Sequence, residues 1–389
     1  MLKPSMHNDL RIYLHKLISH QATREDYTKL EPVLKNLTVL DIFGLFNDEL
    51  KMGTSIETLL GAIDPFIHTI DAHIKAKEVE LPSSGVIGLL RQESDALTQR
   101  LNALQDTFKA HVSFDFDKKA LTPSLEELKL FSMHYVKIQN LLFPSLEKVD
   151  ERFEGLKLLW SMQDLTKNAL SATLNALNAQ PFDSKVFSFC LGDYFFKAFG
   201  LIQKENRFLL QAAHQYLSLD VLDDLFIQSL EYPMCFIEKP QVILPKTKPL
   251  VSSEGLFSSS TGSLSFNQIQ WLLDALPLDV TFIDEDNKVR YFNNAKDRLF
   301  PRSPAVIGRD VRNCHPASSV HVVNEILESF RSNLHNEASF WIQMKEHFVY
   351  IRYQAIRDDQ GTYKGTLELT QLVEDIRALE GERRLLEWK

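Results

Sequence analysis

The chain has 389 residues, of which 44% are hydrophobic and 24% are charged. This length exceeds what one compact core usually holds, so we expect two or three domains. Glycine (14 residues) and proline (15 residues) are scarce, which excludes collagenous and disordered classes and predicts a mostly helical chain. The net charge of −9 argues against a nucleic-acid-binding protein, because phosphate contacts need clustered Lys and Arg.

Cysteine usage and the N-terminal sequence indicate a protein of a reducing compartment. Cys190, Cys235 and Cys314 lie far apart and form no CxxC pair, so neither a structural zinc site nor a disulfide framework is predicted. The first residues lack the apolar segment of a secretory signal, and no stretch reaches the roughly 18 apolar residues of a membrane helix. We therefore expect a cytoplasmic protein without membrane insertion.

Residues 1–80 are predicted to form a small N-terminal helical domain. Leu10, Leu14 and Leu17 recur at the spacing of one helix face, and similar short runs follow them. Each run is brief and is separated from the next by polar residues. This pattern is typical of several short helices packed together.

Residues 81–235 have longer periodic runs and are predicted to form a four-helix bundle. The first run places Leu90, Leu97 and Leu104 on one stripe, and three further amphipathic runs follow it. The connections between the runs are short. Long amphipathic helices with short connections favour an up-down bundle.

Residues 236–263 differ in composition from the segments on either side. Pro240, Pro245 and Pro249 are followed by a serine-rich stretch, and no apolar periodicity is present. Proline and serine in this density favour an extended or flexible connection. We interpret the segment as a linker.

Residues 264–372 change to an apolar period of two, which indicates strands. Two predicted strands form a hairpin, a helical stretch follows, and three more strands complete the domain. This order predicts an α+β domain of sensor type with a five-stranded antiparallel sheet. The predicted strands are 280–283, 289–292, 338–343, 348–355 and 363–370.

Residues 373–389 are predicted to form a C-terminal amphipathic helix. Ile376, Leu379 and Leu386 fall on one seam, and charged residues occupy the other positions. A narrow apolar seam of this kind suits a short coiled-coil contact. We expect the helix to serve in signalling or dimerisation.

Several local strings carry a resemblance to a known family. They are LPLDVTFID at 276–284, NCHP at 313–316 and GTLE at 365–368, together with NLLFP at 140–144 in the bundle. With the domain order, they resemble a prokaryotic family that joins an N-terminal helical domain, a hemerythrin-like (HHE) bundle and a C-terminal PAS domain. The resemblance implies a multidomain fold that is mostly α and is followed by an α+β PAS domain.

The bundle departs from the hemerythrin-like pattern at its metal ligands. A di-iron centre needs several imidazoles and two carboxylates inside the bundle. Of the residues at the ligand positions, only His134, Asp164 and Glu205 remain as metal candidates. We therefore expect no intact di-iron site and regard the bundle as degenerate. The residues that stand at the lost positions are Gly85, Gly88, Gln139, Gln163 and Leu201.

The resemblance to PAS domains also implies a cup that holds haem, flavin or a small apolar ligand. His315 could ligate haem or change its charge near neutral pH, and Cys314 could act as a redox-sensitive thiol. The alternatives, an ordinary loop at these two residues and a filled apolar core, stay open. The predicted apolar lining of the cup is Phe282, Phe292, Phe340, Ile342 and Ile351.

Catalytic motifs are absent from the sequence. It contains no GxxxxGK[ST], GxGxxG, HExxH or GxSxG pattern, so we predict that the protein is not an enzyme. The leading hypothesis is a sensor or adaptor that signals through a protein partner or self-association. Two alternatives remain: an iron-binding protein that responds to oxygen or nitric oxide, and a structural interaction protein without a ligand.

Overall fold

The computed structural model divides the chain into two compact units, Met1–Leu244 and Pro245–Lys389, each of which is described by itself. The expected boundary near residue 80 lies inside the first unit. Within the described residues, no helix combines the length and the apolar character that a membrane span requires. The described residues are 4–111, 118–241, 255–259, 261–296, 298–344 and 347–382.

The first unit begins with short helices, in agreement with the sequence. They are α1 (Pro4–Ile18), α2 (Arg24–Leu34), α3 (Val39–Lys51) and α4 (Ile56–Lys75). Thr23 and Thr38 start α2 and α3 with capping boxes, because each hydroxyl accepts from a backbone N–H three residues on, and Asp26 or Asp41 bonds back. The leucines of the predicted stripe at positions 10 and 14 are fully buried.

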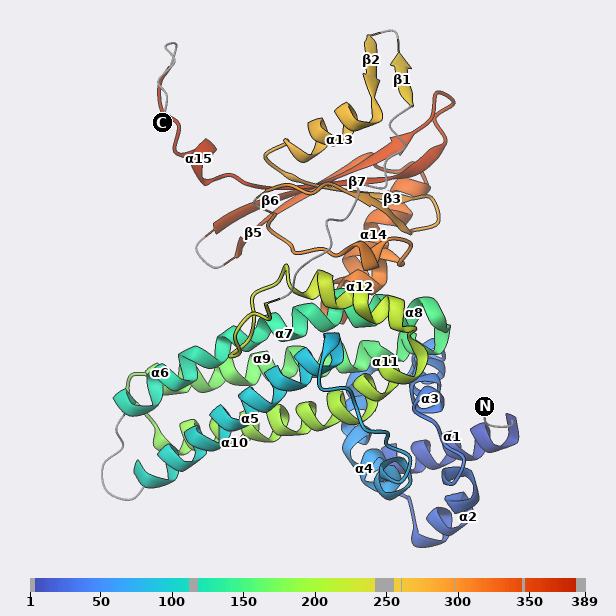
Figure 1. Ribbon diagram of the computed structural model, residues 1–389, viewed down its shortest axis with the longest axis vertical. Helices are drawn as coiled ribbons and strands as arrows, with labels where there is room; N and C mark the ends of the chain where they lie inside the picture. The colour runs from blue at the N-terminus through green and yellow to red at the C-terminus, as the bar shows by residue number, and fades with distance from the viewer. Residues whose placement is uncertain are drawn as a thin grey trace. The chain divides into compact units, whose positions relative to one another are not determined.

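Long helical segments lie side by side in the rest of the first unit (Figure 1). The first is α5 (Gly85–His111), and the third is α9 (Lys157–Asn178), which follows η3 (Glu151–Leu156). The second consists of α6 (Lys118–Leu128), η1 (Lys129–Phe131), α7 (Ser132–Lys137), η2 (Ile138–Leu142) and α8 (Phe143–Val149). The fourth consists of α10 (Ser184–Lys204), η4 (Glu205–Leu209) and α11 (Leu210–Tyr216), and α12 (Leu219–Ser229) follows it. Both η2 and η4 are π-helical.

The N-terminal helices pack directly on the bundle. Asn47 Nδ2 of α3 donates to the carbonyl of Glu151 at 2.9 Å. Gly155 lies so close to α3 that an added Cβ would come within 2.3 Å of the Phe43 carbonyl oxygen. A side chain at this position would therefore separate the two elements.

The second unit begins with a small hairpin, which corrects the linker prediction for its described part. Strands β1 (Leu256–Ser259) and β2 (Gly262–Ser265) pair antiparallel, and α13 (Phe266–Asp274) follows. The serine-rich composition hid the pairing of Phe257 with Leu264, because the other members of these strands are small and polar. Residues 242–254 of the expected linker lie outside the described residues.

The five-stranded antiparallel sheet of the second unit confirms the predicted fold class. Its strand order is β4-β3-β7-β6-β5, so the last strand in sequence lies at the centre (Figure 1). The β3–β4 hairpin is connected to the last three strands by the short η5 (Pro304–Val306) and η6 (Val311–Cys314) and by helix α14 (Ala317–Arg331). The strands are β3 (Asp279–Asp284), β4 (Val289–Phe292), β5 (Glu337–Met344), β6 (His347–Arg357) and β7 (Tyr363–Leu372).

The predicted C-terminal helix is much shorter than expected in its described part. Helix α15 covers only Glu374–Arg377, and residues 378–382 are not helical. The helix ends at Arg377 with Ala378 as its C-cap, and Gly381 beyond it has a φ of +62°, a left-handed conformation that an α-helix does not contain. The seam residue Leu386 lies in 383–389, outside the described residues.

Candidate functional site

Strand β7 carries polar side chains on the face of the sheet that α14 covers. Thr366, Glu368 and Thr370 alternate along the strand and are 1%, 6% and 1% exposed. Their cross-strand neighbours on β6 include Ile351 and Tyr353, which pack with α14 in one apolar cluster. A buried carboxylate is costly unless it has a charged or hydrogen-bonding partner. The Glu368 carboxylate, at the centre of this inner face of the sheet, therefore requires such a partner.

Arg302 is the charged partner of Glu368. Its Nη2 lies 3.4 Å from Glu368 Oε2, and both side chains are about nine-tenths buried. The loop before it is fixed by Asp279, whose carboxylate accepts from the backbone N–H groups of Leu299 at 3.0 Å and Phe300 at 3.2 Å. Arg302 is thus directed at the centre of the sheet by a held loop.

Two polar atoms beside this ion pair lack hydrogen-bond partners among the described residues. They are Nε of Arg302 and Oγ1 of Thr370, both fully buried. Thr370 and Glu368 are two residues apart on one strand, so their side chains project from the same face. Buried unpaired donors in native proteins call for an explanation such as a bound water, ion or ligand.

We call Thr366, Glu368 and Thr370 the polar row; they lie on β7, between β3, which contributes to one apolar cluster, and β6, which contributes to another. The first consists of Ile283, Val289, Val306, Val311 and Leu327. The second consists of Phe330, Val349, Ile351, Tyr353 and Tyr363.

The predicted residue His315 is partly buried. Burial lowers the pKa of His315, the charge of Glu368 acts in the opposite direction, and the charge of Arg302 adds to the lowering. Cys314 packs against the first apolar cluster, and its Sγ donates to the Asp310 carbonyl at 3.7 Å. The charges of the ion pair therefore act on His315, whereas Cys314 has a packing role.

The predicted apolar lining is only partly brought together. Phe292 packs against the first cluster, whereas Ile351 belongs to the second and Phe340 packs against it. Phe282 corrects the prediction. It neighbours Ile283 on β3, so it points to the opposite face of the sheet, where its ring approaches Gly365. Ile342 lies on the same face of β5 as Phe340, opposite Val349 of β6, and is 38% exposed.

In the bundle, the structure brings together two of the three metal candidates. His134 lies between two carboxylates: its Nδ1 is 2.8 Å from Glu93 Oε2, and its Nε2 is 3.5 Å from Glu205 Oε2. Lys137 Nζ also contacts Glu93, and all four side chains are at most 1% exposed. The prediction that Asp164 belongs to this site is wrong, because its side chain is partly exposed and pairs with Lys167 at 2.6 Å.

Two glutamines extend this network across the bundle. Gln139 Nε2 donates to Gln163 Oε1, and Gln163 Nε2 donates to Glu205 Oε1, both at 2.8 Å. Gln139 lies in η2 and Glu205 is the first residue of η4, so both π-helical segments contribute to the network. Such segments occur frequently at functional sites. The residues that replace expected ligands here therefore form a continuous polar chain.

The other replaced positions carry residues that suit the local packing and backbone. An added Cβ at Gly88 would lie 2.3 Å from the carbonyl carbon of Ser83, so only glycine fits there. Gly85 has a φ of +68° at the start of α5, and Leu201 is buried in the apolar core. These positions serve packing and backbone geometry.

The electrostatics of the bundle network favour its ionised form. Burial raises the pKa of Glu93, but His134 and Lys137 outweigh it and bring that pKa below its usual value. Burial lowers the pKa of His134, but the carboxylates of Glu205 and Glu93 outweigh it and raise that pKa. Two carboxylates thus face one ammonium and one imidazolium. We call Glu93, His134, Lys137 and Glu205 the buried charge cluster.

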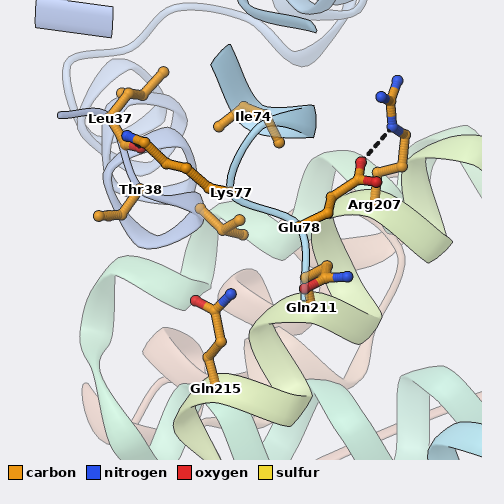
Figure 2. A pocket seen from close by; sticks show the side chains of 9 residues that line it. Leu37, Thr38, Ile74, Lys77, Glu78, Arg207, Gln211 and Gln215 are labelled. Atoms are coloured by element: carbon orange, nitrogen blue, oxygen red, sulfur yellow. Dashed lines mark hydrogen bonds and ion pairs between the residues drawn. The ribbon is translucent and has the colours of Figure 1, made fainter. Parts of the chain in front are cut away.

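A cavity of about 160 Å³ lies where the N-terminal helices meet the bundle (Figure 2). Lys77 Nζ donates to the Leu37 carbonyl at 2.8 Å, and Arg207 Nε donates to Glu78 at 2.7 Å. Gln211 both donates to and accepts from the backbone of Val79. These side chains hold the two parts of the unit together, so we assign the cavity a structural role.

Sequence reasoning missed the ion pair of the sheet and half of the buried charge cluster. A signal was present in each case. Glu368 alternates with two threonines in a strand that is otherwise buried, and Glu93 lies on the same stripe as Leu90 and Leu97. A charge at an inward-facing position indicates either a partner or a ligand.

Comparisons with known proteins identify the second unit. Residues 269–376 match the PAS domain family. A crystal structure of a C-terminal domain from Streptococcus mutans is 30% identical, covering 33% of this chain and 99% of that chain with a TM-score of 0.32. A sensory box sensor histidine kinase from Vibrio cholerae is 14% identical, covering 27% of this chain and 88% of that chain with a TM-score of 0.22.

Among curated proteins, no relative matches the chain. The family match covers most of α13, the whole five-stranded sheet and α14. Both the strand order and the antiparallel pairing agree with it. The C-terminal domain of this chain is therefore a PAS domain.

Proposed function

We propose that the protein is a non-enzymatic sensor or adaptor whose PAS domain binds a small molecule at the polar row of its inner sheet face. The observation that carries the proposal is a pair of buried atoms that have no hydrogen-bond partner in the described part of the chain, Arg302 Nε and Thr370 Oγ1. Arg302 pairs with Glu368 through its Nη2. A ligand with a hydrogen-bonding group would satisfy Arg302 Nε and Thr370 Oγ1, and its apolar part would contact the two apolar clusters. Protonation of His315 would change the charge of the site.

The Thr370 hydroxyl offers a test with little change of shape. Thr370→Val removes the hydroxyl and keeps the branched side chain, so we expect the full-length protein to lose at least half of any small molecule that copurifies with it. Native mass spectrometry of the intact chain measures the added mass directly. Thr362→Val is the matched control, because Thr362 is exposed in the turn before β7 and should retain the wild-type mass.

Two results would contradict the ligand proposal. One is equal retention of the added mass by wild type and Thr370→Val. The other is a wild-type protein that carries only its polypeptide mass and shows no thermal shift with a panel of small carboxylates, amines and porphyrins.

Contacts where β6 begins and β7 ends support a route from the PAS interior to a partner. The backbone N–H of Val373 donates to the Phe348 carbonyl at 3.1 Å, and Arg377 of α15 lies over the Phe348 ring at 4.2 Å. Phe348 is on β6, the strand that also carries Tyr353 and Ile351. A shift of β6 would therefore move α15. The exposed Ile376 and Leu379 would present that shift to another chain.

We expect Leu379→Glu to weaken self-association or partner binding without loss of stability. Leu379 is 77% exposed, so a charge there costs little in the folded chain and opposes an apolar contact. Sedimentation velocity of the full-length protein measures self-association, and thermal unfolding provides the control. An unchanged sedimentation profile, from a wild type that does self-associate, would exclude this residue from the contact.

A further inference from the structure

We infer that Lys137 is a built-in cation that occupies the buried charge cluster in place of a metal ion. Its ammonium contacts Glu93 Oε1 and donates to the Pro233 carbonyl at 3.1 Å, and its side chain is fully buried. Two oxygen ligands that could bind a metal cation thus bind a protein ammonium. The inference concerns the bundle and is independent of the PAS ligand.

The surrounding residues are of types that hold metals in helical bundles. Such sites use carboxylates and imidazoles that project inward from facing helices. Glu93 comes from α5, His134 from α7 and Glu205 from η4. Without Lys137, two buried carboxylates would face a single imidazolium, and the remaining negative charge would favour a cation.

The present arrangement does not fit a di-iron centre. His134 separates the two carboxylates, because its ring nitrogens face Glu93 and Glu205 on opposite sides. Within the part of the chain that the structure describes, no group of three His, Cys, Asp or Glu side chains is placed to hold a metal ion. A divalent ion would also lie next to a buried ammonium, and like charges repel strongly where water is excluded.

The backbone around Lys137 is built to place it at the cluster. Lys137 is the last residue of α7 and directly precedes the π-helical η2. His134 lies three residues earlier, so both side chains project from the same face of the helix. The backbone N–H of Cys235 adds a further donor to Glu93 at 2.8 Å. The protein therefore supplies several donors to this carboxylate from its own chain.

Removing the ammonium should create a cation site. We expect full-length Lys137→Ala to retain about one Co²⁺ per chain after gel filtration, roughly tenfold more than wild type, because ligation by buried residues stabilises the fold that holds the metal. Metal content by mass spectrometry and the thermal shift caused by Co²⁺ are the two measurements. Lys148→Ala is the matched control, since Lys148 is exposed on the following helix.

The variants separate the outcomes. Combining Lys137→Ala with Glu93→Gln should abolish the Co²⁺ retention, because Glu93 Oε1 is the atom that the ammonium contacts. Stoichiometric retention by wild type that Glu93→Gln removes would overturn the inference, because Lys137 would then not exclude metals. A folded Lys137→Ala protein that retains no Co²⁺ would also overturn the inference. If the variant is unfolded, failure of Co²⁺ to restore its helical circular dichroism would overturn it as well.

Discussion

Glu93→Gln is expected to destabilise the first unit by about 3–5 kcal/mol, the usual loss when one partner of a buried ion pair is removed. Glu93 accepts from His134 at 2.8 Å, from Cys235 at 2.8 Å and from Lys137, and its side chain is completely buried. The amide has nearly the shape of the carboxylate but carries no charge. Two buried cations would then face only Glu205.

Urea unfolding of the full-length protein, followed by hydrogen exchange of peptides from residues 1–244, measures this loss in the correct unit. Asp95→Asn makes the same chemical change two residues away on α5, where the side chain is exposed. It should change the unfolding free energy by no more than about 0.5 kcal/mol. A similarly small effect of Glu93→Gln would show that the buried charges do not stabilise one another.

Gly365→Ala is expected to destabilise the PAS domain by about 2–5 kcal/mol, from backbone strain and overpacking together. Gly365 has a φ of +148°, a conformation that other residues rarely adopt. An added Cβ would lie 2.2 Å from the Ile283 carbonyl oxygen and 2.8 Å from the Phe282 ring. The central strand β7 would have to move away from β3.

Gly361→Ala separates the two causes of this loss. Gly361 also has a positive φ, +78°, but nothing lies within 4 Å of an added Cβ. Its cost should be only the strain of the left-handed conformation, about 1–2 kcal/mol. Hydrogen exchange of β3 and β7 peptides measures both variants. Equal losses would mean that close approach to β3 adds nothing.

The sequence predicted the five strands and the long bundle helices because their apolar periods are strong and local. It did not predict the β1–β2 hairpin, because that pairing depends on Phe257 and Leu264 among small polar residues. It also extended the C-terminal helix through Gly381, whose left-handed backbone an α-helix does not contain. Local composition was a poor guide in both segments.

Residue type alone was enough to predict some members of the candidate sites. The members whose burial depends on partners distant in sequence were missed. His134 and Glu205 were identified, whereas Glu93 and Lys137 were not, since charges in an amphipathic helix usually face solvent. Their burial results from contacts between residues more than 40 positions apart in sequence. Glu368 was quoted only as part of a string, and its partner Arg302 lies 66 residues away.

The Gln211–Val79 hydrogen bonds also have a consequence for synthesis of the chain. Gln211 follows Val79 by 132 residues, so the N-terminal helices leave the ribosome long before the bundle surface that holds them. At about 5–20 residues per second, the interval is about 7–26 s. During that time the apolar residues that later line the joint, such as Ile42, Phe46 and Ile63, have no bundle to cover them. The nascent chain therefore exposes an aggregation-prone apolar surface, which a chaperone would cover until α11 emerges.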